Sequence, residues 1–218
     1  MMITRELIHS MPKTDLHVHL DGSLRPATLL ELAAENGVTL PFATEAHVVE
    51  YMRTTALRDL PTYLSVFDLT CQVMQSESAL RRIAFELAED ATRENVRYME
   101  VRFSPLLHEN SGLGWKRIIQ AVLNGLRDAE DRYVIHTGVI LCGMRTMTPE
   151  MSLRLAQTCV DFKDHGVVGF DLAGAERDYP AKDHREAFFY IRNHNISSTV
   201  HAGEGFGPPS IHQAVHYC

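Results

Sequence analysis

Residues 15–22 read Asp-Leu-His-Val-His-Leu-Asp-Gly, a short apolar segment that carries two histidines. Side chains alternate between the two faces of a β-strand, so His17 and His19 point to one face and the residues between them to the other. Two imidazoles brought together in this way can share one divalent ion, and zinc suits nitrogen ligands. An isolated His-x-His also occurs by chance on half-buried strands. Both histidines here lie in an apolar strand, where unpaired polar groups are unfavourable, and this favours a metal site.

A second polar motif lies near the other end of the chain, where residues 199–205 read Thr-Val-His-Ala-Gly-Glu-Gly. It places His201 at the end of an expected strand and Glu204 in a glycine-rich turn. A catalytic zinc site commonly has three protein ligands and an open position for water. A nearby carboxylic acid can then transfer a proton to the leaving side, and Glu204 is placed to do so. The alternative for Glu204 is an ordinary solvated acid in a loop.

The rest of the chain alternates short β-branched or apolar runs with longer segments of helical periodicity, which is typical of βα units around a parallel sheet. We expect five strands, at 14–20, 97–103, 133–141, 167–172 and 197–201. This order fits either a doubly wound sheet or a (β/α)₈ barrel. No glycine-rich nucleotide-binding motif follows an early strand. Further polar residues, Arg102, Ser104 and Asp171, fall at the ends of expected strands, where a barrel carries its functional groups.

The first expected helix follows Pro26, with Ser23 as a plausible N-cap, and ends near Gly37. Residues 41–76 then form a long insertion, helical at 46–54 and 61–75, before the next strand. An insertion of this size suits a lid or a binding loop over a pocket.

Composition narrows the class of protein. The 218 residues are 45% hydrophobic and carry a formal net charge of −7, so we expect one globular domain over residues 1–218 without general affinity for nucleic acid. We find neither an apolar run long enough to cross a bilayer nor a signal-peptide core at the start, so we expect a cytoplasmic protein. The four cysteines show no Cys-x-x-Cys pairing and are expected to be reduced.

The two histidine motifs together closely resemble the metal-dependent adenosine deaminases of the amidohydrolase type, in their bacterial-like form. The resemblance extends through Glu-Val-Arg-Phe-Ser-Pro at 100–105, Met-Arg at 144–145 and Asp-Leu-Ala-Gly-Ala-Glu at 171–176. It covers the chain from about Met11 to Cys218. Five linked motifs are far more specific than any one of them, and they imply the α/β class with a (β/α)₈ barrel.

The resemblance also implies a role for individual residues. It makes His17, His19 and His201 ligands of one zinc ion, and Glu204 the proton shuttle that protonates purine N1 as hydroxide attacks C6. The implied reaction converts adenosine, and 2′-deoxyadenosine as well, to inosine-type products and ammonia. The implied substrate contacts are a ribose 5′-hydroxyl bond to Asp21, a backbone N–H bond from Gly174 to purine N3, and an apolar gate formed by Leu60, Tyr63 and Phe67. On periodicity alone, the favoured interpretation of these three residues is the buried stripe of a helix.

Family members continue beyond the position of Cys218 through three more βα units, which supply a further catalytic histidine and a pair of aspartates. We therefore expect this chain to hold only about the first five βα units of the barrel, and its activity alone to be in question. The alternatives are a catalytically incompetent fragment or purine-binding partner subunit, and a deaminase of a related purine such as adenine. Related adenine deaminases carry Glu in place of Asp21. Cyclic-amide or phosphoester hydrolases usually depend on a bridging lysine, and cytidine deaminases need a Cys-x-x-Cys that is missing here.

Overall fold

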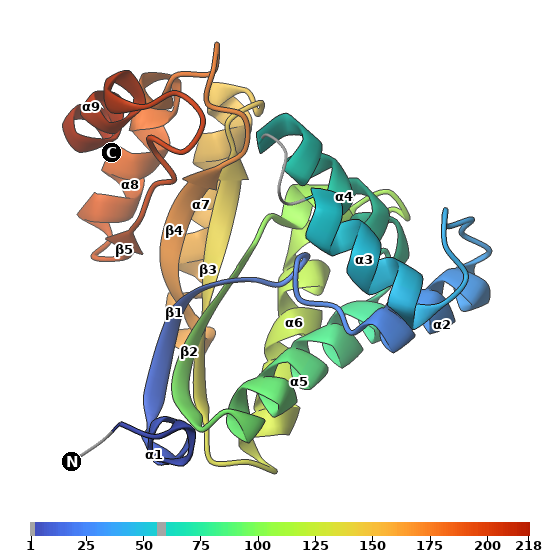
Figure 1. Ribbon diagram of the computed structural model, residues 1–218. Coiled ribbons are helices and arrows are strands. Elements are labelled where there is room, and N and C mark those ends of the chain that lie inside the picture. The colour runs from blue at the N-terminus through green and yellow to red at the C-terminus, as the bar shows by residue number, and fades with distance from the viewer. Residues whose placement is uncertain (1–2, 56–59) are drawn as a thin grey trace.

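The computed structural model describes residues 3–55 and 60–218, with the side chains of residues 55 and 60–65 outside the described part. In this part of the chain, parallel strands form one sheet in sequence order, β1-β2-β3-β4-β5 (Figure 1). The strands are β1 Lys13–His19, β2 Val96–Phe103, β3 His136–Met144, β4 Val167–Ala173 and β5 Ser197–Ser198. Each strand lies beside its predecessor and is reached through at least one helix, which confirms the predicted α/β class with five parallel strands.

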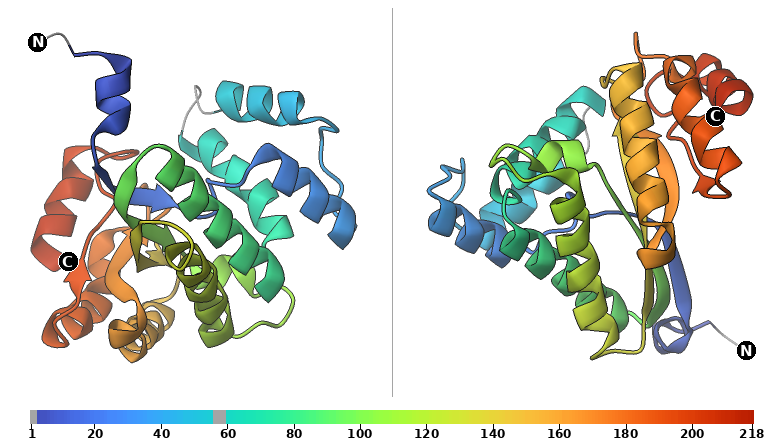
Figure 2. Two further views of the ribbon diagram at one scale, coloured as in Figure 1. Left: turned by 90° about the horizontal axis from the view of Figure 1, so that it is seen from below. Right: turned by 180° about the vertical axis from the view of Figure 1, so that it is seen from behind.

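The helices of the described residues alternate with these strands (Figure 2). They are α1 Arg5–Ser10, α2 Pro26–Asn36, α3 Glu45–Thr55, α4 Leu60–Val73, α5 Glu77–Arg93, α6 Trp115–Glu130, α7 Pro149–Asp161, α8 Arg185–Asn193 and α9 Pro208–Tyr217, with the 3₁₀ turns η1 Pro105–His108, η2 Lys163–His165 and η3 Ala181–His184. Helices α3 and α4 confirm that the long insertion between the first two strands is helical in two parts.

Local chemistry sets where several helices begin. Ser76 caps α5 by accepting a hydrogen bond from the backbone N–H of Ala79 at 3.2 Å, as an N-cap serine should. The prediction of Ser23 as the N-cap of α2 is wrong: the N-cap is Arg25, and the Ser23 hydroxyl donates to the His19 carbonyl at 2.5 Å. Pro26 at the first helical position, with its fixed φ, sets the start of this helix without a side-chain cap.

Two predicted strands have different bounds in the structure. β3 begins at His136 instead of 133, because the Tyr133 N–H still bonds to the Ala129 carbonyl at 2.8 Å and so extends the end of α6. β5 is regular only at Ser197–Ser198 instead of 197–201. The chain nevertheless continues along β4, since the His201 N–H donates to the Leu172 carbonyl at 3.0 Å. With a partner on one side only among the described residues, this segment makes fewer ladder bonds than a central strand.

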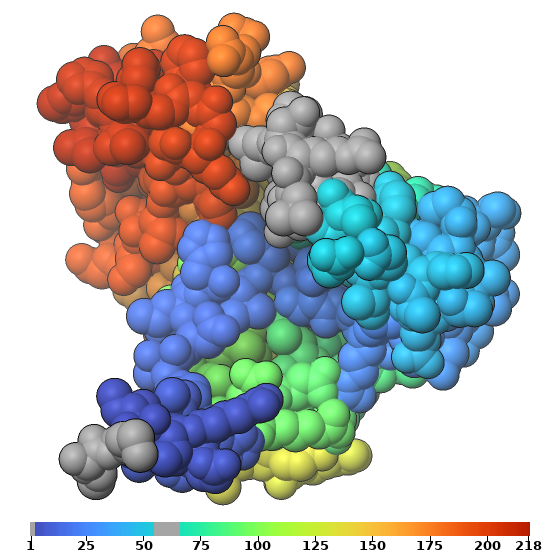
Figure 3. All heavy atoms as spheres, viewed as in Figure 1, coloured from blue at the N-terminus to red at the C-terminus, as the bar shows by residue number. Residues whose placement is uncertain are grey.

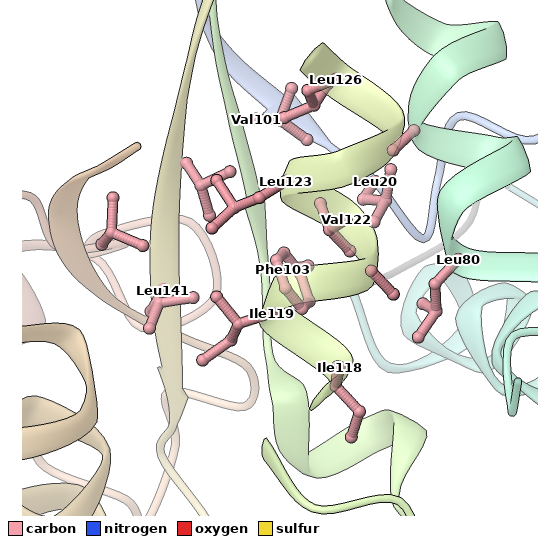
Figure 4. Close-up of a cluster of buried hydrophobic side chains, with 14 of the residues drawn as sticks. Leu20, Leu80, Val101, Phe103, Ile118, Ile119, Val122, Leu123, Leu126 and Leu141 are labelled. Carbon is pink, nitrogen blue, oxygen red and sulfur yellow. The ribbon is translucent and has the colours of Figure 1, made fainter. Parts of the chain in front are cut away.

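The core lies between the sheet and the helices behind it, and α6 is at its centre (Figure 4). Ile119 and Leu123 of α6 lie close to the sheet residues Phe103 and Leu141. Leu80 of α5 lies on the opposite side of α6. Helices α5 and α6 approach so closely that a Cβ on Gly125 would lie 2.1 Å from the Arg81 carbonyl oxygen. A glycine is therefore required at this crossing.

Strand β1 forms one end of the sheet, and its residues 14–17 are exposed. Figure 3 shows the N-terminal segments, in blue, on the face that also carries the C-terminal segments, in red. The first and last parts of the described chain thus share one face of the molecule. This arrangement brings the two histidine motifs together.

Candidate active site

The three predicted metal ligands converge. The Nε2 atom of His17 lies 3.2 Å from that of His19 and 2.8 Å from that of His201, and the remaining pair is 3.1 Å apart. His17 and His19 come from β1, whereas His201 follows β5, at the opposite end of the strand order. Side chains from the two end strands can meet only if the sheet curls toward a barrel. The contact between the histidines is therefore also evidence for the curvature of the fold.

The donor set fits a zinc ion. Three ring nitrogens cannot all donate to one another, and a tetrahedral site with bonds of about 2.0–2.1 Å places its nitrogens about 3.3 Å apart, close to the observed separations. Burial, followed by the charge of His201, lowers the pKa of His19 to about 4. Burial and then the Arg102 charge also lower the pKa of His17. Both shifts favour the neutral imidazole, which is the form that binds a metal. Among the described residues, these three are a group able to hold a metal ion.

A buried ion pair between Asp171 and Arg102 lies beside the Nδ1 atom of His201. Asp171, with no exposed surface, lies with Oδ2 2.9 Å from the His201 Nδ1 atom and 2.8 Å from Arg102 Nη1. Arg102 also donates from Nη2 to the Leu16 carbonyl at 2.9 Å. Burial alone would raise the pKa of Asp171, but the nearby His201 ring and the Arg102 charge outweigh it and lower the pKa to about 2. A carboxylate beside Nδ1 favours a proton on that nitrogen, and a proton there leaves Nε2 free for a metal.

A cavity of about 660 Å³ opens in front of the histidines. Asp21, Phe67, Gly174 and Glu204, all predicted site residues, line it. A volume of this order suits a small-molecule ligand. The side chains of the other two predicted gate residues, Leu60 and Tyr63, lie outside the described residues.

Each of the lining residues has a distinct setting. Asp21 is 6% exposed and its Oδ1 atom has no hydrogen-bond partner among the described residues; the nearest histidine nitrogen, His19 Nδ1, is 4.0 Å away. Burial raises the pKa of Asp21 to about 6. Gly174 has φ +98°, a left-handed conformation that favours glycine. Phe67 packs its ring 6.2 Å from that of His19, and Glu204 is an exposed side chain at the cavity wall.

Sequence reasoning did not assign several residues that the structure brings to this site. The cavity is also lined by Cys142, Met144 and Thr146, which lie at or just after the end of β3. The positions of Arg102 and Asp171 at strand ends marked them as polar candidates, but no sequence pattern indicated their contact with each other or with His201. A rule that inspects every residue at the carboxyl end of a barrel strand would have found all five.

Histidines that converge from the ends of curled parallel strands onto a cavity define a metal-binding α/β-barrel protein. The sequence pattern of the adenosine deaminase family matches residues 12–218. The chain belongs to the adenosine deaminase family. Among the described residues, no helix is long and apolar enough to cross a membrane.

Relatives and solved structures agree with this membership. Adenosine deaminase from Mycobacterium sp. strain KMS is 44% identical over 221 residues, which cover 99% of this chain but 61% of that protein. A cog1816 amidohydrolase from Burkholderia ambifaria with bound Zn superposes with a TM-score of 0.87 at 27% identity, over 99% of this chain and 60% of the other. Arabidopsis ADAL complexed with GMP gives a TM-score of 0.82 at 31% identity, over 95% of this chain and 62% of the other. The chain therefore spans about three fifths of the length of these proteins.

Proposed function

We propose that this chain carries the zinc site and the purine pocket of a deaminase that hydrolyses adenosine to inosine and ammonia. One observation carries the proposal: the unpaired carboxylate oxygen of buried Asp21 lines the same cavity as the three converging histidines. A buried acceptor without a donor is unfavourable, so it points to a hydroxyl group of a ligand.

His17, His19 and His201 would hold the zinc ion, because the lowered pKa values of His17 and His19 favour neutral imidazoles and the Nε2 atoms of all three lie within 3.2 Å of one another. The Burkholderia relative with bound Zn supports the choice of metal. When bound, zinc lowers the pKa of a coordinated water toward neutrality and so supplies a nucleophile at ordinary pH. Asp171, beside the His201 Nδ1 atom, would favour the tautomer that leaves Nε2 for the metal.

Proton transfer and substrate binding are the remaining proposed roles, and they belong to residues that line the cavity. Glu204, at the cavity wall, would donate a proton to N1 as the nucleophile adds to C6, and the amino group would then leave C6 as ammonia. The backbone N–H of Gly174 would donate to N3, and Asp21 would accept from the ribose 5′-hydroxyl. Phe67 would form part of the apolar wall beside the purine.

The carboxylates in the cavity wall favour a neutral purine nucleoside over a purine nucleotide. No lysine or arginine is found in the cavity wall within the described part of the chain, whereas Asp21 and Asp68 both line it. A 5′-phosphate, such as that of the GMP bound to Arabidopsis ADAL, would meet carboxylates here and be repelled. A free base such as adenine would leave Asp21 unpaired, and a site that reads a hydroxyl discriminates against its absence. Both arguments favour the neutral nucleoside.

The test compares substrates on the 218-residue chain with zinc added. We expect loss of the ultraviolet absorbance of adenosine, with adenosine turned over more efficiently than AMP or adenine, and loss of turnover in the Glu204→Gln variant. Faster turnover of AMP or adenine would contradict the choice of substrate. Bound zinc without turnover of any purine would instead support the alternative of a purine-binding chain that is not catalytic by itself.

A further inference from the structure

The backbone of the loop that carries Glu204 donates hydrogen bonds to the side chain of another acid, Glu176. Glu176 is 4% exposed, and its carboxylate accepts from three successive backbone N–H groups. Oε1 accepts from Glu204 at 3.3 Å, and Oε2 accepts from Gly205 at 3.1 Å and from Phe206 at 2.7 Å. A charged acceptor makes stronger hydrogen bonds than a neutral one, so this contact fixes the backbone of the turn.

A buried cation anchors the start of the same segment. Arg145, 3% exposed, donates from Nη2 to the His201 carbonyl at 2.8 Å and from Nη1 to the Tyr179 carbonyl at 2.7 Å. The chain from His201 to Phe206 is therefore tied at both ends by buried charged side chains. Between these ties stands Glu204, whose own side chain is exposed toward the cavity.

The turn at residues 203–207 depends on these hydrogen bonds because its glycine-rich sequence leaves the backbone flexible. Gly203 has φ +91° and Gly207 has φ +64°, so glycines on both sides of the turn occupy left-handed conformations. Glycine has the largest conformational freedom of any residue. Without the Glu176 bonds, the N–H groups of residues 204–206 would lose the partners that the described structure gives them, and the carboxyl group of Glu204 would sample more positions.

We propose that Glu176 is a positioning residue that sets the Glu204 backbone so that the Glu204 carboxyl group reaches the reacting purine. Glu176 is not among the residues that line the cavity, so it acts through Glu204 and not on the substrate. The proposal rests on the proposed function for the catalytic consequence. The hydrogen bonds themselves can be tested without any turnover.

The first test measures amide hydrogen exchange on the zinc-loaded chain. Glu176→Gln keeps the size of the side chain but offers one acceptor oxygen in place of two, and Glu176→Ala removes both. We expect exchange at residues 204–206 to accelerate about tenfold or more in both variants, while β4 and α7 exchange at the parent rate. The matched control is Glu186→Gln, at an exposed position of α8, which leaves all these rates unchanged. Unchanged exchange at 204–206 in Glu176→Gln would overturn the proposal, and this variant decides the matter if Glu176→Ala does not fold.

The second test separates positioning from binding. In Glu176→Gln we expect zinc affinity within about threefold of the parent, since the three histidines lie elsewhere, and kcat for adenosine to fall on the order of 100-fold while KM changes little. A variant with unchanged kcat and a raised KM would contradict a positioning role. If the parent itself does not deaminate adenosine, the proposed function fails, and the exchange measurement still decides whether Glu176 holds the loop.

Discussion

The Nδ1 atom of His201 lies 2.9 Å from the Oδ2 atom of Asp171, although Asp171 lies in β4 and His201 follows β5. The carboxylate beside Nδ1 favours a proton on that nitrogen, which leaves Nε2 to face the other two histidines. Asp171 is in turn neutralised by Arg102, which is almost fully buried. The metal site therefore depends on a chain of contacts that extends into the barrel interior.

Replacing Asp171 tests this dependence. Asp171→Asn removes the charge that holds the His201 proton, so we expect zinc affinity to fall about 10–100-fold, measured by competition with a chelator. Because Arg102 then remains buried without a counter-ion, the variant should also unfold at a lower temperature. Asp68→Asn, an exposed carboxylate in the same cavity, is the control and should retain parent affinity. Parent affinity in Asp171→Asn would show that the carboxylate does not orient the ligand.

The substrate role of Asp21 predicts a change in selectivity. Asp21→Ala removes the acceptor for the ribose hydroxyl, so kcat/KM for adenosine should fall by about 10-fold or more while that for adenine does not fall. The ratio of the two values is the measurement, because it cancels any general loss of activity. An unchanged ratio would mean that Asp21 does not recognise the hydroxyl.

Packing at the crossing of α5 and α6 predicts an effect on stability. Alanine usually stabilises a helix relative to glycine by about 1 kcal/mol. At Gly125, however, the new Cβ would lie 2.1 Å from the Arg81 carbonyl oxygen, and overpacking of this kind costs about 1–3 kcal/mol or more. We expect Gly125→Ala to lower the free energy of unfolding in urea. Lys116→Ala, at an exposed position of α6, is the control and should change it by less than about 1 kcal/mol. A more stable Gly125→Ala protein would contradict the close approach of the helices.

Buried His108 predicts a dependence of stability on pH. Burial lowers the pKa of His108 from 6.5 to about 4 in the folded chain. Between these values the unfolded chain binds a proton that the folded chain does not, so the free energy of unfolding falls as pH decreases from 6.5 to 4, by up to about 3 kcal/mol. Above pH 6.5 this contribution is fully present. His108→Leu should remove this part of the slope, and an identical slope in both proteins between pH 4 and 6.5 would contradict the prediction.

Much of the fold could be predicted because its signals are local. The expected strands at 97–103 and 167–172 agree with β2 and β4 to within one residue at each end. The predicted ends of strands and helices are wrong where a contact outside the local sequence pattern sets them. Tyr133 and Val134 have the composition of a strand, yet the hydrogen bond to Ala129 keeps the chain at the end of α6. Ser23 has the chemistry of an N-cap, yet Pro26 starts the helix.

The sequence by itself determined that His17 and His19 share one face of a strand, since alternation of side chains is a property of the extended backbone over a few residues. It also determined, through linked motifs, membership of the adenosine deaminase family. Only the tertiary structure brought His201 to within 2.8 Å of His17, because that meeting requires the twist of every strand between them to accumulate into a curled sheet. The support of His201 by Asp171 and of the Glu204 loop by Glu176 depends on the pairing of β4 with β5 and the chain that follows it, because these residues come from neighbouring segments of the sheet. Contacts between residues distant in sequence are set by how the strands pack, and no local pattern encodes them.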